Sequence, residues 1–153
     1  MHTNGYSLVR HVLGLDGKAP PLHEFHPELG RTLGEELLEP HRSYYPLVQP
    51  VLGMVKSMAH ITGGGLVENM PRALPTELGS RLDSAAWALP PIFSILQERS
   101  NVTKDEMYRV FNMGLGLVMV CDPSRAEEIT SLVPEARVVG EVISAAKDRC
   151  IIL

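Results

Sequence analysis

Apolar residues along the chain recur with two spacings, one typical of helices and the other typical of strands. Spacings of three and four residues predict amphipathic helices, whereas β-branched or alternating runs predict strands. The expected helices are residues 6–13, 32–38, 44–55, 66–74, 91–98, 103–111 and 124–132. The expected strands are residues 56–62, 81–85, 115–120, 137–143 and 150–153. Because the two kinds alternate, we expect an α+β fold with a mixed β-sheet and helices packed against it.

The length of the chain predicts one domain. A chain of 153 residues with 44% hydrophobic residues buries roughly two-thirds of its unfolded surface, which suits a single compact unit. Between residues 15 and 41, four prolines interrupt the apolar pattern around one short helix. We expect residues 1–153 to form one domain, with this stretch on its surface.

Net charge and hydropathy limit the classes of binding partner and the cellular compartment that we expect for the protein. Lysine and arginine total 14 against 18 acidic residues, so the net charge of -4 predicts neither a nucleic-acid nor a membrane partner. No apolar run approaches the roughly 18 residues of a membrane span, and the amino terminus lacks the regions of a signal peptide. We expect a soluble, cytoplasmic protein in which Cys121 and Cys150 are reduced, packed thiols.

The sharpest local pattern is a strand that runs into three glycines before a helix. Side chains alternate along a strand, so His60 and Thr62 should share one face while Ile61 takes the other. Gly63, Gly64 and Gly65 permit close backbone approach, and N–H groups at the following helix start favour an anion such as phosphate. A plain connecting turn explains the same residues, and the pattern leaves both interpretations open.

Two further clusters are candidates for polar contacts. The segment from His2 to Ser7 is either a polar loop that presents its side chains or a helix-start signal capped by Thr3 or Asn4. After the helix predicted at 103–111, Asn112 is a polar candidate, while Gly116 is better explained by tight packing. Cysteines and histidines show no zinc-ligand spacing, so no metal site is expected.

Taken in order, these clusters resemble one family, the aminoimidazole ribonucleotide synthetases, also called phosphoribosylformylglycinamidine cyclo-ligases. The likeness covers essentially the whole chain, and several motifs in fixed order are more specific than one glycine loop. The motifs are His2-Thr3-Asn4-Gly5-Tyr6-Ser7-Leu8-Val9-Arg10, Ala59-His60-Ile61-Thr62-Gly63-Gly64-Gly65 with Glu68-Asn69, and Glu106-Met107-Tyr108-Arg109 with Phe111-Asn112-Met113-Gly114.

The resemblance implies a carboxy-terminal domain of a two-domain enzyme, without the amino-terminal ATP-binding domain. In the family reaction of purine biosynthesis, ATP activates the formyl oxygen of formylglycinamidine ribonucleotide, the ring closes, and ADP and phosphate leave. ATP and Mg²⁺ are therefore expected in the parent enzyme, none tightly bound to this half, which alone should be inactive. The implied partners are the nucleotide substrate, the missing domain and a second copy in a homodimer.

The same resemblance implies a site for substrate or phosphate, without assigning a catalytic residue. Its expected members are His2, Asn4, Ser7, His60, Thr62, Gly63, Gly64, Gly65 and Asn112. Two alternatives remain. One is the carboxy-terminal domain of another ATP-dependent superfamily member of the selenophosphate synthetase, thiamine monophosphate kinase or hydrogenase maturation type. The other is a non-catalytic module that self-associates through surface left open by a lost domain.

Overall fold

The computed structural model describes residues 1–145 and 147–153, and their elements confirm the α+β class. The α-helices are α1 (Tyr6–Val12), α2 (Leu33–Leu37), α3 (Tyr45–Val48), α4 (Gly65–Arg72), α5 (Pro91–Arg99), α6 (Lys104–Val110) and α7 (Ala126–Leu132). The 3₁₀ helices are η1 (Gln49–Met54), η2 (Ser84–Ala86) and η3 (Pro123–Arg125). The strands are β1 (Phe25–His26), β2 (Arg31–Thr32), β3 (Val55–His60), β4 (Leu78–Leu82), β5 (Leu117–Cys121), β6 (Gly140–Ser144) and β7 (Cys150–Ile152).

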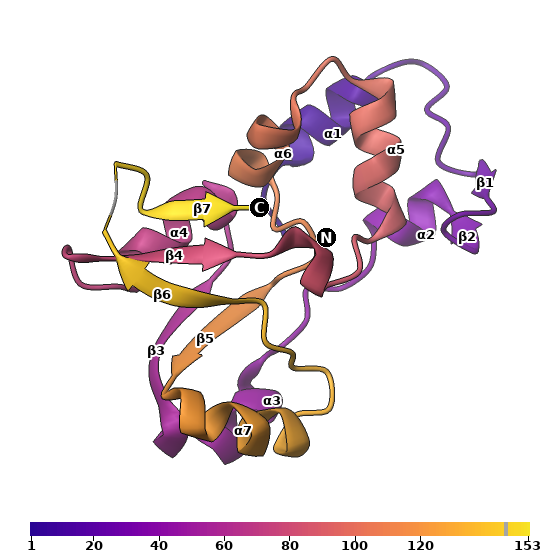
Figure 1. The fold of residues 1–153 in the computed structure, drawn as a ribbon. Coiled ribbons are helices and arrows are strands. Elements are labelled where there is room, and N and C mark those ends of the chain that lie inside the picture. The colour runs from indigo at the N-terminus through magenta and orange to yellow at the C-terminus, as the bar shows by residue number, and fades with distance from the viewer. Residues whose placement is uncertain (146) are drawn as a thin grey trace.

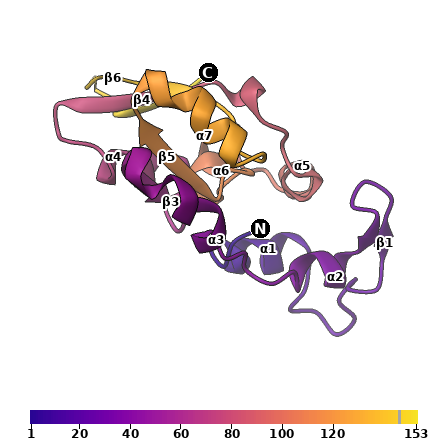
Figure 2. The ribbon, with the colours of Figure 1, turned by 90° about the horizontal axis from the view of Figure 1, so that it is seen from below.

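The strands of the described residues fall into three small sheets. Strand β4 lies at the centre of the mixed sheet, antiparallel to β6 and parallel to β7. Strands β3 and β5 form an antiparallel pair in which His60 lies opposite Leu117. Strands β1 and β2 form a small hairpin. Figures 1 and 2 place this hairpin and α2 at the end of the molecule away from the β6–β4–β7 sheet.

Local hydrogen bonding explains why several helices begin where the sequence predicted. Thr32 and Glu35 form a reciprocal capping box at α2, and the Thr103 hydroxyl accepts a hydrogen bond from the Glu106 N–H at α6. Helix α3 carries a proline in its first turn, where no N–H is needed, and continues into the tighter η1. These short-range signals fix the residues at which α2, α3 and α6 begin.

The main core lies where α1, α4, α5 and α6 meet the strands. Phe93 of α5 and Phe111 after α6 are almost fully buried, with ring centroids 5.5 Å apart. Val51, Ile129 and Val133 form a smaller core between η1 and α7. Burial of this kind is the main stabilising contribution to the fold, at about 25 cal/mol for each Å² of apolar surface.

Three expectations are corrected in detail. The strand expected at residues 81–85 is β4 at Leu78–Leu82, because the Asp83 carboxylate accepts a hydrogen bond from the Ala85 N–H and turns the chain into η2. The strand expected at 137–143 begins only at Gly140. The helix-cap interpretation of Thr3 or Asn4 is wrong, since α1 follows Gly5 in a left-handed conformation (φ +81°) with no side-chain cap.

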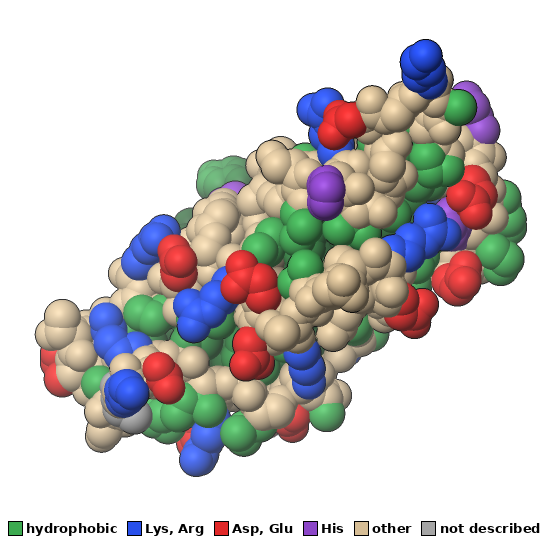
Figure 3. Space-filling model, turned by 90° about the horizontal axis from the view of Figure 1, so that it is seen from above, with side chains coloured by type: hydrophobic (Ala, Val, Ile, Leu, Met, Phe, Trp, Pro, Cys, Tyr) green, Lys and Arg blue, Asp and Glu red, His purple; other side chains and the backbone are tan. Residues whose placement is uncertain are grey.

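The surface mixes charge signs and includes one large apolar groove. Acidic and basic side chains are interspersed over the face seen in Figure 3, with apolar side chains visible between them. A groove of about 890 Å³ lies between the β4–β6 strands and the β5–α7 region, and Leu82, Val118 and Ile129 are among its lining residues. Within the described residues, no helix is long and apolar enough to cross a membrane.

Candidate functional site

His2 ties the amino-terminal segment to the end of β3. Its Nδ1–H donates a hydrogen bond to the Ile61 carbonyl over 2.7 Å, and its Nε2 accepts one from the Tyr44 hydroxyl over 2.6 Å. A carbonyl only accepts, so the Ile61 bond fixes the proton of the ring on Nδ1. Only 6% of His2 is exposed. The structure brings His2 close to His60, another predicted site residue, with ring centroids 5.2 Å apart.

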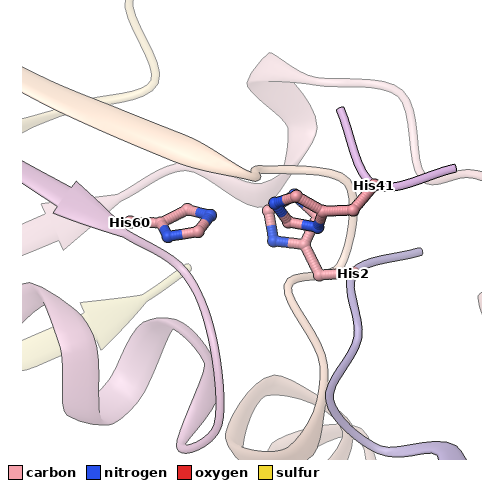
Figure 4. A group of neighbouring side chains, drawn as sticks. All are labelled: His2, His41 and His60. Atoms are coloured by element: carbon pink, nitrogen blue, oxygen red, sulfur yellow. The ribbon is translucent and has the colours of Figure 1, made fainter. Parts of the chain in front are cut away.

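Strand β3 presents His60 outward, as its alternation predicted. Ala59 and Ile61 are buried at 4% and 0% exposure, whereas Met58 and His60 are exposed. The Ile61 N–H donates to the Gly116 carbonyl, which extends the β3–β5 pairing one residue beyond β3. Side chains of a strand alternate, so burying the Ala59 face in the core directs His60 to the surface beside His2 and His41 (Figure 4).

Asn69 organises the glycine loop. From α4, its side-chain amide donates hydrogen bonds to the carbonyls of Gly63 at 3.1 Å and Gly65 at 2.7 Å. The Thr62 hydroxyl lies 3.5 Å from the Asn69 amide oxygen. The loop of residues 62–65 therefore curls around one buried amide, that of Asn69.

The structure explains why glycine is needed at two of the three positions of the loop, for different reasons. Gly65 has φ +55°, and a Cβ there would lie 2.8 Å from the Phe111 carbonyl oxygen and closer still to that of Tyr108. Gly64 has φ +92°, and its Cβ would lie 2.7 Å from the Glu68 Cβ. A Cβ at Gly63 would meet nothing within 4 Å. Packing and backbone conformation explain Gly64 and Gly65, while Gly63 borders open space.

Asn4, Ser7 and Asn112 do not join His2 and His60 through any hydrogen bond between described residues. The Asn4 amide donates to the Val110 carbonyl at the end of α6, over 2.6 Å. Asn112 is buried, and its side-chain oxygen accepts from the Gly114 N–H in a turn at which Met113 has φ +49°. Ser7 lies exposed on α1. Asn4 and Asn112 thus have clear structural roles, and their contact with a ligand stays a prediction.

A shallow hollow beside His60 includes residues that the sequence analysis did not select. It measures about 410 Å³ and is lined by His41, Arg42, Ser43, Tyr44, His60 and Leu117. The Arg42 guanidinium forms two hydrogen bonds of 2.5 Å with the Glu135 carboxylate, which holds the pKa of Glu135 below its usual range. His41 ends the stretch of residues 15–41 that was expected on the surface, and Arg42 follows it, so only their position beside β3 identifies them as site residues.

Burial shifts the pKa values of two groups beside the hollow, His2 and Tyr44. It lowers the pKa of His2 to about 4, against the opposing effect of its hydrogen bond to Ile61. Burial likewise raises the pKa of the Tyr44 phenol. At neutral pH, His2 is therefore an uncharged hydrogen-bonding group, and the Arg42 guanidinium carries a positive charge at the hollow.

Comparison with known proteins shows the family of the chain. The model of the family described as "AIR synthase related protein, C-terminal domain" matches residues 1–152. The chain belongs to this family. Its matched region includes the His2 segment, the glycine loop and the hollow.

Curated relatives carry one shared description. The phosphoribosylformylglycinamidine cyclo-ligase of Geobacillus thermodenitrificans is 44% identical over 152 residues, covering 95% of this chain and 44% of that protein. The Bacillus pumilus protein of the same name is 44% identical over 146 residues, covering 92% and 40%. A Bacillus cereus cyclo-ligase is 42% identical over 155 residues, covering 95% and 44%. The chain thus spans less than half the length of these relatives.

Proposed function

We propose that the chain is one half of a phosphoribosylformylglycinamidine cyclo-ligase and forms one wall of its substrate site. The whole protein uses ATP to close the imidazole ring of formylglycinamidine ribonucleotide, giving aminoimidazole ribonucleotide, ADP and phosphate. Identity of 42–44% to cyclo-ligases supports this reaction over those of other superfamily members. The proposal makes the chain alone inactive, because the relatives contain as much sequence again outside the matched region.

The observation that carries the proposal is the hydrogen bond between His2 and the Ile61 carbonyl. This bond joins two motifs 59 residues apart at the point where β3 enters the glycine loop. A polar cluster assembled from distant segments, and bordered by a hollow, is the usual arrangement of a small-molecule site. If each motif had only a local structural role, the two motifs would not need to contact each other.

Residues of the hollow take distinct roles in the proposal. Arg42 supplies a guanidinium suited to the phosphate of a ribonucleotide, after exchange of its contact with Glu135. His60 is exposed at the hollow and contacts the substrate directly. His2, with both ring nitrogens engaged, is a positioning residue that holds Tyr44 against the end of β3.

The glycine loop has a smaller role in anion binding than its composition suggests. The Glu68 carboxylate lies beside Gly64 at the start of α4, where it opposes a second negative charge. Glu68 also pairs with Arg72 over 2.9 Å, which removes part of that charge. In this proposal, Gly63 offers its backbone to the substrate because it borders open space.

ATP and Mg²⁺ belong, in this proposal, to the part of the enzyme outside this chain. Mg²⁺ prefers carboxylate, phosphate and water oxygens. Among the described residues, no three carboxylates converge as metal ligands, and the one converging group consists of histidines. The described residues therefore offer no carboxylate set suited to Mg²⁺, which supports placing its site outside this chain. Its own contribution is to position the substrate and exclude water.

Reconstitution tests the function. ADP release is followed after adding ATP, Mg²⁺ and formylglycinamidine ribonucleotide to the chain, to a separately expressed amino-terminal half of a cyclo-ligase from the same source, and to their mixture. We expect release only from the mixture. If the mixture releases no ADP although sedimentation shows that both halves are folded and associated, the result would count against a cyclo-ligase. It would favour another superfamily member or a non-catalytic module.

A further inference from the structure

Three histidines from distant parts of the chain converge beside the hollow. His2 comes from the amino-terminal segment, His41 from the segment that precedes α3, and His60 from the end of β3. Figure 4 shows the His41 ring against that of His2, with His60 facing both. One ligating nitrogen from each ring lies within 4.8 Å of the other two. We propose that His2, His41 and His60 form a site for a divalent transition-metal ion of the zinc class.

The spacing of the rings matches that of a metal-bound set. With Zn–N bonds of about 2.0–2.1 Å, tetrahedral coordination places imidazole centroids about 5 Å apart. The observed centroid separations are 4.4, 5.2 and 5.4 Å. The ligating nitrogens need to approach to about 3.3 Å in such a site, which requires a modest rotation of the rings. His41 and His60 are exposed and form no hydrogen bond with other described residues, so their rings can make this adjustment.

The backbone already orients the buried ligand. A metal-bound histidine commonly donates its second ring N–H to a carbonyl, which fixes the tautomer and aims the other nitrogen at the ion. His2 makes such a bond from Nδ1 to the Ile61 carbonyl, over 2.7 Å. This bond leaves the lone pair of Nε2 as the one that a metal ion can take, and in this structure that lone pair accepts the Tyr44 hydroxyl hydrogen. Aromatic packing alone requires neither this orientation nor the convergence of ring nitrogens.

Tyr44 competes for the same lone pair. Its hydroxyl donates to His2 Nε2 over 2.6 Å, so an ion has to displace this hydrogen bond. Arg42 lies 6.0 Å from the Tyr44 ring, and the Glu135 carboxylate that pairs with it offsets its repulsion of a cation. Three neutral imidazoles and a water molecule complete a four-coordinate set, which suits Zn²⁺, Ni²⁺ or Cu²⁺ rather than Mg²⁺ or Ca²⁺.

Zinc titration of the intact chain, prepared without a histidine tag, tests the site directly. A chromophoric chelator that competes for Zn²⁺ reports affinity and stoichiometry, and we expect one ion per chain. His41→Ala and His60→Ala should each weaken binding at least about tenfold, since loss of even an outer-shell partner of a ligand has an effect of this size. His11→Ala and His23→Ala are matched controls, because both residues are exposed and lie outside the cluster. Equal binding by the His41 variant and the His11 control would overturn the proposal.

Two further variants separate the site from simpler explanations. Tyr44→Phe removes the competing hydroxyl, so it should tighten zinc binding by up to about tenfold, as loss of one ordinary hydrogen bond predicts. Adding residues before Met1 moves the terminal amine away from His2 and should leave the zinc affinity unchanged. A loss of zinc affinity would show that the terminal amine, rather than the histidines, binds the ion. Far-UV circular dichroism of each variant reports folding. Binding that ignores His41 and His60 in folded variants, or that Mg²⁺ matches, would contradict a zinc-class site.

Discussion

Acidification should destabilise the fold through His2 before it affects the carboxylates. Burial lowers the pKa of His2 from 6.5 to about 4, so the folded chain keeps this ring neutral where the unfolded chain protonates it. Between these two pH values the unfolded state binds more protons, and stability falls as the pH falls. A shift of 2.5 units at 1.36 kcal/mol per unit amounts to about 3 kcal/mol. This stability is present above pH 6.5 and is lost by about pH 4.

Urea unfolding at several pH values measures this effect. Fluorescence of Trp87, which is 8% exposed and the one tryptophan of the chain, reports unfolding, and a chelator keeps metal ions away from the histidines. His2→Gln should flatten the profile between pH 6.5 and 4, whereas His11→Gln should retain it. The lowered pKa values of Glu35 and Glu135 affect stability only below about 4.5. Equal losses for the native chain and His2→Gln would refute the argument.

Three further predictions follow from the glycine loop and the groove. Gly65→Ala should lower the free energy of unfolding by about 3 kcal/mol, because alanine is strained at a left-handed backbone position and its Cβ overpacks the site. Gly63→Ala is the control and should change this free energy by no more than about 0.5 kcal/mol. Equal urea midpoints for the two variants would contradict the prediction. Asn69→Asp removes the donor to the carbonyls of residues 62, 63 and 65 and should cost about 2 kcal/mol by the same assay. An unchanged urea midpoint would contradict this prediction. The apolar groove predicts self-association at high concentration, which a clean monomer in sedimentation equilibrium would exclude.

Features that depend on neighbours in sequence could be predicted. The capping of α6 by Thr103 and the alternation of Ala59, His60 and Ile61 need only a few adjacent residues, and both are confirmed. The end of β4 was missed because Asp83 has no strong breaker beside it, and its turn depends on a side-chain hydrogen bond. Strand pairing was also beyond reach, since it is decided by contacts far apart in sequence.

The candidate site likewise contains residues that local motifs predict and residues that only the fold brings together. Motif order brought out His2, His60 and the glycine loop, whereas His41 and Arg42 depend on how the chain returns from the 15–41 stretch to β3. The sequence places Asn69 in a motif but predicts no role for it. An asparagine within a helix gives no sign of whether it is buried, and here burial and its bonds to Gly63 and Gly65 carbonyls make it the organiser of the loop.

The most direct test of the central claim is the substrate dependence of ADP release by the reconstituted halves, comparing His60→Ala with His11→Ala. If the hollow beside β3 is the substrate wall, His60→Ala lowers kcat/KM for formylglycinamidine ribonucleotide at least about tenfold, the scale of a lost hydrogen bond to a charged substrate. His11→Ala, on the exposed side of α1, stays within about twofold. Equal kcat/KM values for the two variants, with both folded and associated, would contradict the account.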